Sequence, residues 1–454
     1  MPLSLLPITI VPTKSFQKKN HSIKISRSLI HYWGMDEAKI FDVAVGSNRI
    51  PVNIESASIT KDEIIMSEDL FRELMLPIQS TQFIAQFSQN KNTLTIGPVI
   101  GLLTEINLSD EKEPNFRSIH NFCMEMHEVI SEKGGFFYVF SLTDYSNGNI
   151  SGYYLVNESW YKSPVPLPDV IYNRIHSRRL EASIFFKKFK TAIVSRNIPI
   201  FNDHFLSKDK VNDLFISEEY LHPFLPETLL ATEQSLEELM MKYDSIYIKP
   251  IHGSQGRNII RVSKKMNSLQ VEISTSMGRE QANSFHTFSQ FFKWVQPFLE
   301  KRTYIVQQGI PLIKYKNNQL DFRVLCHRSL QNSWKATSAV ARISAQQQFV
   351  SNIARGGEMM KPIHVLTKLS DRKTAIQQLA LMKELAVETS SIIGHHSDGL
   401  MGELGVDIGV DESGKLWIIE VNAKPSKNLG ENENKIRPST KALIEYCTFL
   451  TFSK

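Results

Sequence analysis

Two carboxylates and one carboxamide, Asp407, Glu420 and Asn422, lie within the segment GELGVDIGVDESGKLWIIEVNAKP (402–425). Carboxylate and amide oxygens are hard ligands that suit Mg²⁺, an ion that keeps coordination positions open for phosphate groups. An ordinary hairpin whose polar residues face solvent is an equally good explanation of this segment taken alone. The apolar neighbours on both sides of Glu420 argue against full exposure of that carboxylate.

A β-hairpin must position these side chains. The pattern predicts two strands that flank the polar turn 411–414, which ends on glycine. Side chains alternate between the two faces of a strand. A register that pairs Val410 with Lys415 therefore places Asp407 diagonal to Glu420 and on the same face, within reach of a shared ion.

A second segment, YIKPIHGSQGRNIIRV (247–262), combines a lysine with a loop of small residues. A strand is expected to present the lysine, and the chain then turns back into another strand. Backbone N–H groups in such a loop can surround phosphate oxygens, with basic side chains supplying charge. Neither a Walker A loop nor a GxGxxG fingerprint occurs in the chain, and a plain hairpin turn is the alternative for this segment alone. The candidate residues are Lys249, Gly253, Ser254, Gln255, Gly256 and Arg257.

Arginines and polar residues on later strands form a third candidate group. Three arginines separated by predicted strands could point at one anion, because the planar guanidinium binds phosphate or carboxylate through two parallel hydrogen bonds. Each arginine taken alone is better explained by a surface ion pair. The group comprises Gln307, Gln308, Gly309 and Ile310, then Asp321 and Arg323 in DFRVL, Arg342 in VARI, and Asn352 in SNIARGGE.

The composition argues against several classes of protein. Lys and Arg total 52 against 47 Asp and Glu, a net charge of +5, whereas a dedicated nucleic-acid-binding protein concentrates basic residues on one face. The three cysteines show no paired spacing, which argues against a disulfide framework or a zinc site. No apolar run approaches the length of a membrane span. We expect a cytoplasmic protein.

The chain of 454 residues predicts about three domains, at roughly 150 residues per domain. Residues 1–96 predict a small β-rich domain, with a hairpin around the Gly-Ser-Asn turn of KIFDVAVGSNRIPVNI (39–54). Within it, SEDLFRELML (67–76) predicts a short helix with Ser67 as its N-cap. Residues 97–205 alternate strand and helix, which is typical of βαβ units in a small α/β domain. Residues 206–454 mix helices with antiparallel-looking strands. The expected fold class is α/β, or α+β over the chain as a whole.

Glycine is scarce but clustered. Six of the 21 glycines fall between Gly394 and Gly414, beside the predicted metal ligands. Glycine allows other groups to approach the backbone closely. We interpret Gly402, Gly405 and Gly409 as positions where a metal ion and its phosphates approach the strand; Gly394 and Gly399 have no explanation in the sequence.

Taken in order, these motifs resemble those of the ATP-grasp superfamily. That family has a lysine before its central strands, matched by Lys210 in SKDKVNDLF, a second lysine before a flexible loop, matched by Lys249, and a hinge strand, matched by residues 307–310. A closer similarity is carried by the segments GPVIGLLTE, PDVIYNRI, LPET, YIKPIHGSQGR, DFRVL and IEVNAKP. On these segments, and over nearly the whole chain, the sequence is similar to the YheC/YheD group of endospore coat-associated ATP-grasp proteins.

The resemblance implies an ATP-grasp fold in which 97–205 is the pre-ATP-grasp domain. It implies ATP-dependent ligation, in which a carboxylate accepts the γ-phosphoryl group and an amine then displaces phosphate. The acidic residue that often follows the hinge and contacts ribose is absent here, and Asp321 is the candidate to replace it. The implied roles are Mg²⁺ binding by Asp407, Glu420 and Asn422, phosphate binding by Lys210, Lys249 and the loop 253–257, adenine contacts by 307–310, and catalysis by Arg342 with Arg323 and Asn352 nearby.

The implied substrates are a small molecule or peptide with a carboxylate, together with an amine acceptor. Spore coat proteins are the implied macromolecular partners, and association with the spore is implied beside the cytoplasm. Two alternatives stay open. The chain could be a structural coat component that retains the fold with little or no catalysis, or a phosphotransferase that uses the same ATP site on another acceptor.

Overall fold

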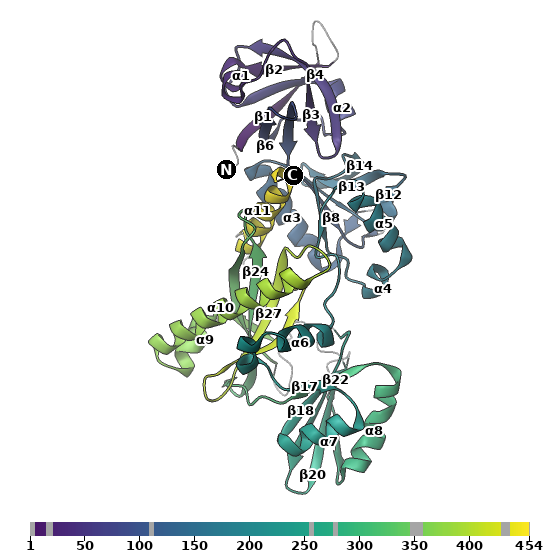
Figure 1. The fold of residues 1–454 in the computed structure, drawn as a ribbon, viewed down its shortest axis with the longest axis vertical. Helices are drawn as coiled ribbons and strands as arrows, with labels where there is room; N and C mark the ends of the chain where they lie inside the picture. The colour runs from purple at the N-terminus through teal and green to yellow at the C-terminus, as the bar shows by residue number, and fades with distance from the viewer. Residues whose placement is uncertain are drawn as a thin grey trace.

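A closed β-barrel occupies the N-terminal part of the chain, at the top of Figure 1. The computed structural model describes residues 5–14, 21–108, 113–253, 258–275, 280–345, 357–427 and 436–453. The predicted hairpin of this region is confirmed, since β3 and β4 pair antiparallel around Gly46, which has a positive φ of 56°. Ser67 caps α2 as predicted, accepting a hydrogen bond from the Leu70 N–H at 3.1 Å. The barrel order is β1-β5-β2-β4-β3-β7-β6, with strands β1 Leu6–Thr13, β2 Ser22–Ser26, β3 Phe41–Val45, β4 Asn48–Ala57, β5 Glu63–Ser67, β6 Thr81–Ser88 and β7 Thr93–Gly97, and helices α1 Arg27–Trp33 and α2 Glu68–Glu73.

The middle sheet follows the barrel and contains the predicted βαβ unit. Its strand β8 pairs in parallel with β11 and β15, and β15 pairs in parallel with β16. All five residues of β8 are buried, which explains why it reads as an uninterrupted apolar run. The elements are β8 Val99–Leu103, α3 His120–Lys133, β11 Phe136–Phe140, β12 Tyr145–Ser146, β13 Asn149–Val156, β14 Ser159–Val165, β15 Val170–Asn173, α4 Arg178–Glu181, α5 Ile184–Val194 and β16 Ile200–Phe201.

Two further sheets lie below the middle sheet in Figure 1. The third, at the bottom, has the order β17-β22-β18-β19-β20-β21: β17 Thr228–Leu230, β22 Tyr304–Gln308, β18 Ser245–Pro250, β19 Ile260–Lys265, β20 Ser268–Ser274 and β21 Glu280–Phe285, with α7 Glu233–Lys242 and α8 Phe288–Lys301. The fourth has the order β26-β25-β24-β27-β28, with β23 pairing β24: β26 Glu358–Met360, β25 Trp334–Ile343, β24 Asn318–Arg328, β27 Glu403–Val410, β28 Leu416–Asn422 and β23 Lys314–Tyr315. Helices α6 Lys208–Ile216, α9 Pro362–Leu369 and α10 Arg372–His396 complete this part.

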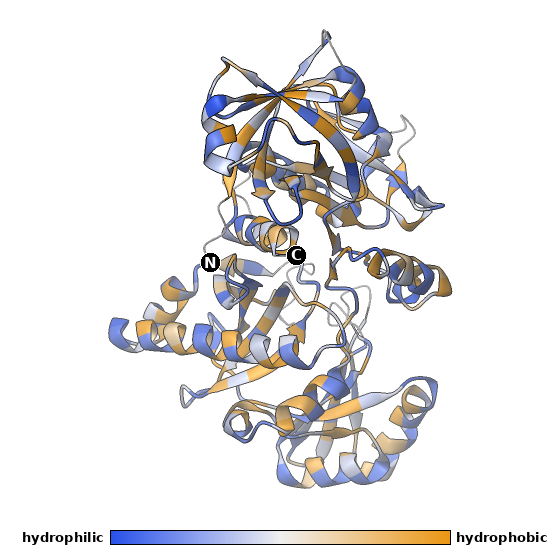
Figure 2. Ribbon diagram, turned by 45° about the horizontal axis from the view of Figure 1, so that its top comes forward, coloured by the Kyte–Doolittle hydropathy of each residue, from blue (hydrophilic) through white to orange (hydrophobic). Residues whose placement is uncertain are grey.

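Hydrophobic residues are interspersed with hydrophilic ones along most elements (Figure 2), as expected for elements that bury one face. The last helix, α11 Pro438–Phe452, connects distant parts of the chain. Its residues Leu443 and Tyr446 share a hydrophobic core with Ile100 and Phe122 of the middle sheet and α3, and it also contacts β24 of the fourth sheet. The barrel ends at Gly97, next to the predicted boundary, but the division into three domains stays a prediction.

Candidate functional site

A cleft lies where the third sheet meets α6 and the last strand of the fourth sheet. Polar and charged side chains enter it from both sides, and an apolar wall completes it. The polar lining includes Lys208 and Asn212 of α6, Thr228, Lys249 and Gln307 of the third sheet, and Glu420 and Asn422 of β28; the apolar lining includes Leu206, Val211, Phe215, Leu225, Ile305, Ile418 and Ile419.

The strand register that positions the acidic residues differs from the prediction. Val410 pairs with Leu416, and Asp407 lies directly opposite Glu420. The predicted pairing of Val410 with Lys415 is wrong because the turn begins one residue later: the Asp411 N–H donates to the Lys415 carbonyl oxygen at 3.0 Å. A β-bulge next to Asp407 then leaves Ile419 without a partner on β27. The bulge brings the two carboxylates closer in register than a regular hairpin would.

Asp407 is held by two arginines from neighbouring strands. Arg323 donates from Nε to Oδ1 at 2.7 Å and from Nη2 to Oδ2 at 2.8 Å, while Arg342 Nη2 lies 2.9 Å from Oδ2. Burial alone would raise the pKa of Asp407, but these guanidinium groups outweigh it and lower the pKa below its usual value. Arg342 also binds both oxygens of Asp321, at 2.6 and 2.7 Å, so the predicted ribose ligand forms a buried ion pair.

Two lysines enter the cleft. Lys208 of α6 forms an ion pair with Glu420, and Lys249 donates from Nζ to Gln307 Oε1 at 2.5 Å. The pKa of Lys249 is lowered to about 8, mainly by burial and also by the positive charge of Lys208, although the charges of Glu420 and Asp407 oppose this change. Lys249 thus lines the cleft near the end of β18, and its role as a phosphate ligand stays a prediction.

Lys210, the other predicted phosphate ligand, does not lie in the cleft. Its side chain is exposed on α6, whereas Lys208, two positions earlier, enters the cleft. Residues two apart on an α-helix point about 200° apart around the axis. The segment SKDK offered both lysines, and only the phase of the helix, which packing determines, distinguishes them.

The four predicted hinge residues have different positions. Gln307 lines the cleft, and its Nε2 donates to Thr228 Oγ1 at 2.9 Å. The N–H groups of Gln308 and Gly309 already donate to the carbonyl oxygens of Glu227 and Ser245, both at 2.8 Å, and Ile310 accepts from the Leu312 N–H at 2.9 Å. A side chain at position 309 would meet the Ser245 carbonyl oxygen at 2.5 Å, which explains the glycine there.

The phosphate-loop candidates lie mostly beyond the described ranges. Gly253 is described, and its N–H donates to the Pro250 carbonyl oxygen at 3.1 Å. Ser254, Gln255, Gly256, Arg257 and the catalytic candidate Asn352 are outside the described residues.

The glycine cluster has a different cause from the one expected. A Cβ at Gly402 would meet Tyr446 and Phe201 at 2.6 and 2.7 Å, and one at Gly409 would meet Leu312 at 2.5 Å. At Gly405 the neighbour is Pro425, at 2.9 Å. The interpretation that a metal and phosphates approach these glycines is wrong, because protein side chains occupy the space. Packing also explains the remaining two: Gly394 lies against Trp334, and Gly399 against Asp203.

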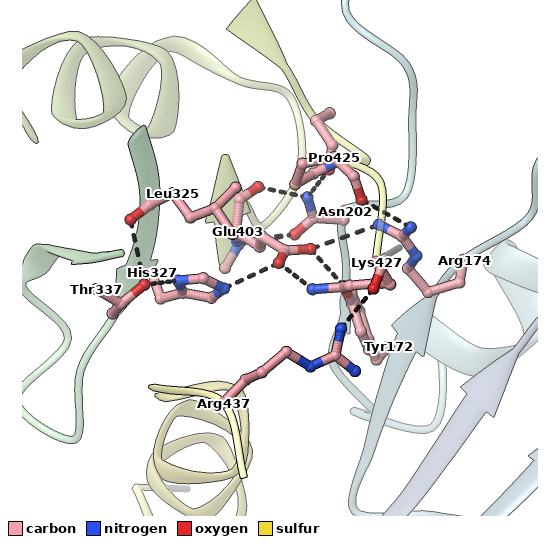
Figure 3. A network of polar contacts seen from close by, with 12 residues as sticks. Tyr172, Arg174, Asn202, Leu325, His327, Thr337, Glu403, Pro425, Lys427 and Arg437 are labelled. Atoms are coloured by element: carbon pink, nitrogen blue, oxygen red, sulfur yellow. Dashed lines mark hydrogen bonds and ion pairs between the residues drawn. The ribbon is translucent and has the colours of Figure 1, made fainter. Parts of the chain in front are cut away.

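A second polar cluster lies between the middle and fourth sheets, and no sequence motif indicated it (Figure 3). Glu403 of β27 is fully buried at its centre. Tyr172 donates its hydroxyl to Glu403 Oε2 at 2.5 Å, His327 Nε2 lies 2.9 Å from Oε1, and Lys427 forms an ion pair with Oε1. Arg174 Nη1 lies 3.4 Å from Oε2. We name these five residues the Glu403 cluster. Its members are spread over 172–427, so only the tertiary fold brings them together.

The acidic hairpin fits Mg²⁺ in the chemistry of its donors. Glu420 and Asn422 line the cleft, and the Asn422 amide lies 3.4 Å from Asp407 Oδ2. Two carboxylates and one amide oxygen are suitable ligands for this ion, although Asp407 would have to share its oxygens with Arg323 and Arg342. Within the described ranges, no group of three or more His, Cys, Asp or Glu side chains converges as a metal site.

The family is identified by comparison with known proteins. Residues 197–450, more than half of the chain, match the family described as YheC/D like ATP-grasp. The chain therefore belongs to the YheC/D-like ATP-grasp family, and its fold is an ATP-grasp fold of mixed helices and strands.

Among the helices in the described ranges, none has the length and apolar character that a membrane span requires.

Two curated relatives are proteins of Bacillus subtilis (strain 168). The endospore coat-associated protein YheD is 26% identical over 400 residues, which cover 87% of this chain and 86% of YheD. The endospore coat-associated protein YheC is 21% identical over 311 residues, covering 65% of this chain and 80% of YheC.

Solved ATP-grasp ligases are similar in structure at low sequence identity. The D-alanine-D-alanine ligase from Coxiella burnetii gives a TM-score of 0.45 at 10% identity, with 78% of this chain and 95% of the ligase covered. The ATP-grasp ligase PsnB, in a complex with a precursor variant, Mg and ADP, gives a TM-score of 0.42 at 13% identity, with 77% and 98% covered.

Proposed function

We propose that this protein is an ATP- and Mg²⁺-dependent ligase that joins a carboxylate to an amine through an acyl phosphate. The observation that carries the proposal is the cleft, in which lysines from α6 and β18 face carboxylate and amide groups of β28. Membership of an ATP-grasp family supports ATP as the nucleotide. A charged cleft between two sheets suits the alignment of a phosphoryl donor with its acceptor.

In this proposal the lysines bind phosphates and the apolar wall receives the base. Lys208 takes the role that the sequence suggested for Lys210, and Lys249 is retained. Gln307, Ile305 and Ile418 line the cleft, and we propose that they contact adenine. Bound Mg²⁺ would neutralise charge on the phosphates, held by Glu420 and Asn422 with Asp407.

The arginines on β24 and β25 are proposed to stabilise the phosphoryl group in transfer. Arg342 is fixed by Asp321, and Arg323 by Asp407, so both guanidinium planes are oriented before substrate binds. Asp321 is proposed as the residue that orients Arg342. The loop 253–257 and Asn352 keep the roles suggested by the family resemblance, closure over the phosphates and a contact with phosphate or acceptor.

Calorimetry with the non-hydrolysable analogue AMPPNP tests the site. Mg²⁺ is expected to strengthen binding, and Glu420→Gln is expected to weaken Mg²⁺-dependent binding by about 10- to 100-fold, because it removes a charged ligand. Glu412→Gln, an exposed carboxylate on the turn of the same hairpin, is the matched control. Equal affinity with and without Mg²⁺, or no effect of Glu420→Gln, would show the metal assignment to be wrong.

A structural role is the second candidate, and one observation favours it. Both oxygens of Asp407 accept hydrogen bonds from arginines, an arrangement that stabilises the fourth sheet without a metal. The names of YheD and YheC suggest association with the spore coat, and we propose a cytoplasmic protein that associates with the spore. ADP and phosphate release, measured with pooled amino acids, peptides and peptidoglycan precursors, separates the two roles. Nucleotide binding without stimulation by any pool would favour the scaffold, and a phosphorylated acceptor would indicate a phosphotransferase.

A further inference from the structure

Arg178 is a cation of the cleft that forms no ion pair with a carboxylate in the described ranges. It begins α4, next to the middle sheet, so it enters the cleft from a different part of the fold than the phosphate-site lysines. Its Nε atom is buried without a hydrogen-bond partner, and its two Nη atoms reach the Leu206 carbonyl oxygen at only 3.4 and 3.5 Å. A guanidinium has five N–H donors, so most of its capacity is unused.

The carboxylates around Arg178 already have other partners. Glu420 pairs with Lys208. Glu181, on the same short helix as Arg178, pairs with Lys424 and accepts hydrogen bonds from Asn173 Nδ2 at 2.7 Å and from the Phe205 N–H at 3.0 Å. Both acids attract Arg178 at longer range, but burial outweighs them and lowers the pKa of the guanidinium.

Phe205 holds two cations at this end of the cleft. The Arg178 Cζ atom lies 4.4 Å from the ring centroid, and the Lys424 Nζ atom also lies 4.4 Å from it. Cations near an aromatic face are attracted by the ring quadrupole. The ring thus fixes the guanidinium without using its N–H groups, which remain available to a ligand.

We propose that Arg178 binds the carboxylate of the substrate through its guanidinium fork, with Phe205 as the support and Lys424 adding charge. This inference rests on the proposed ligase function, which already requires a carboxylate substrate, and assigns the residue that binds this carboxylate from the side of the middle sheet. Arg178 is half-buried, and its buried Nε–H without a partner costs free energy unless a ligand completes it; a carboxylate matches the geometry of the guanidinium. Lys424, at the proposed substrate site, follows the proposed metal ligand Glu420 by four residues, so their Cα atoms lie at most about 14 Å apart. The substrate is therefore bound within the same cleft as the nucleotide.

The test compares Arg178→Gln with Arg179→Gln, which removes the same charge from the adjacent, exposed position. One measurement is the Kd of Mg·AMPPNP by calorimetry. The other is ADP release from ATP with increasing amounts of a pool of amino acids and dipeptides, against the same pool as C-terminal amides. Melting curves of each variant show whether it is folded.

We expect wild type to respond to the acids and not to the amides. In Arg178→Gln the half-saturating concentration of the acid pool rises by about 10- to 100-fold, as for a lost charge-assisted hydrogen bond, while the Kd of Mg·AMPPNP changes less than twofold. Arg178→Lys, which keeps the charge and loses the fork, falls between the two, and Arg179→Gln behaves as wild type.

Three outcomes would overturn the inference alone. They are an unchanged acid response in Arg178→Gln, an equal response of wild type to acids and amides, and a parallel loss of AMPPNP affinity in Arg178→Gln, which would assign Arg178 to a nucleotide phosphate. A wild type that binds AMPPNP but releases no ADP in response to acids, or that does not bind AMPPNP at all, would instead contradict the proposed ligase function and the inference with it, and both results are seen without any substitution.

Discussion

The Glu403 cluster and the cleft both place charged side chains among apolar ones, but they differ in how completely those charges are paired. Glu403 contacts four side chains and is fully buried. In the cleft, neither Lys249 nor Arg178 forms an ion pair with a carboxylate in the described ranges. A closed cluster joins two sheets, whereas partly bonded cations leave capacity for a ligand.

The pKa directions follow this difference. Burial opposes the charge of Glu403, but Lys427, His327 and Arg174 outweigh it and lower the pKa of the carboxyl below its usual range. Burial lowers the pKa of Lys427 to about 8 in spite of Glu403. The charges of the cluster therefore depend on one another, and removal of one leaves the others buried without compensation.

The largest expected effect comes from breaking the closed cluster. Glu403→Gln keeps the shape of the side chain but leaves Lys427 and Arg174 without their counter-charge, so we expect unfolding free energy to fall by about 3–5 kcal/mol. Urea unfolding followed by circular dichroism measures this loss. The exposed Glu412→Gln is the control and should change stability by less than about 0.5 kcal/mol. A similar, small change in both variants would contradict a structural role for the cluster.

A smaller effect, on binding and not on folding, is expected from the cleft. Lys208→Met should weaken Mg·AMPPNP by about 10- to 100-fold, since it removes a charged phosphate ligand, with little change in stability. Lys210→Met removes the same charge from the exposed face of α6 and should bind as wild type does. If Lys210→Met is the weaker binder of the two, the phosphate lysine is the one that the family motif suggested.

The effect that is smallest near neutral pH is a pH dependence of nucleotide binding. Lys249 has a pKa of about 8 because it is buried; it is positively charged below that pH and neutral above it. The Kd of Mg·AMPPNP should be flat between pH 7 and 7.5 and rise above pH 8, approaching tenfold per pH unit. Calorimetry from pH 7 to 9.5 measures the profile.

The matched variant for this profile is Lys249→Arg, whose charge does not titrate in this range. It should flatten the rise. A profile that is unchanged in Lys249→Arg would assign the titration to another group, such as Lys424, whose pKa burial also lowers to about 8.

Local patterns in the sequence predicted the elements well. The hairpin around Gly46, the parallel βαβ unit and the strands that carry Asp407 and Glu420 were all identified, because strand alternation and helix periodicity are local properties. The bulge beside Asp407 could not be seen, since an extra residue in one strand leaves no periodic signal.

Choices made by tertiary packing were beyond the sequence. The phase of α6 selects Lys208 over Lys210, and the Glu403 cluster joins residues up to 255 positions apart (427 − 172 = 255). The glycines of 402–409 were interpreted as space for a ligand, but aromatic, leucine and proline side chains fill that space. The sequence did not single out Arg178, because its lack of an ion-pair partner is visible only in the folded structure.

The packing of α11 has a consequence for how the chain folds during synthesis. Leu443 and Tyr446 complete the apolar core around Ile100 and Phe122, so the middle sheet is made early and its covering helix only after residues 206–437. The long separation makes this contact slow to form. The nascent middle sheet keeps an apolar face uncovered while the remainder is translated, and that interval is where we expect chaperone dependence and aggregation to concentrate.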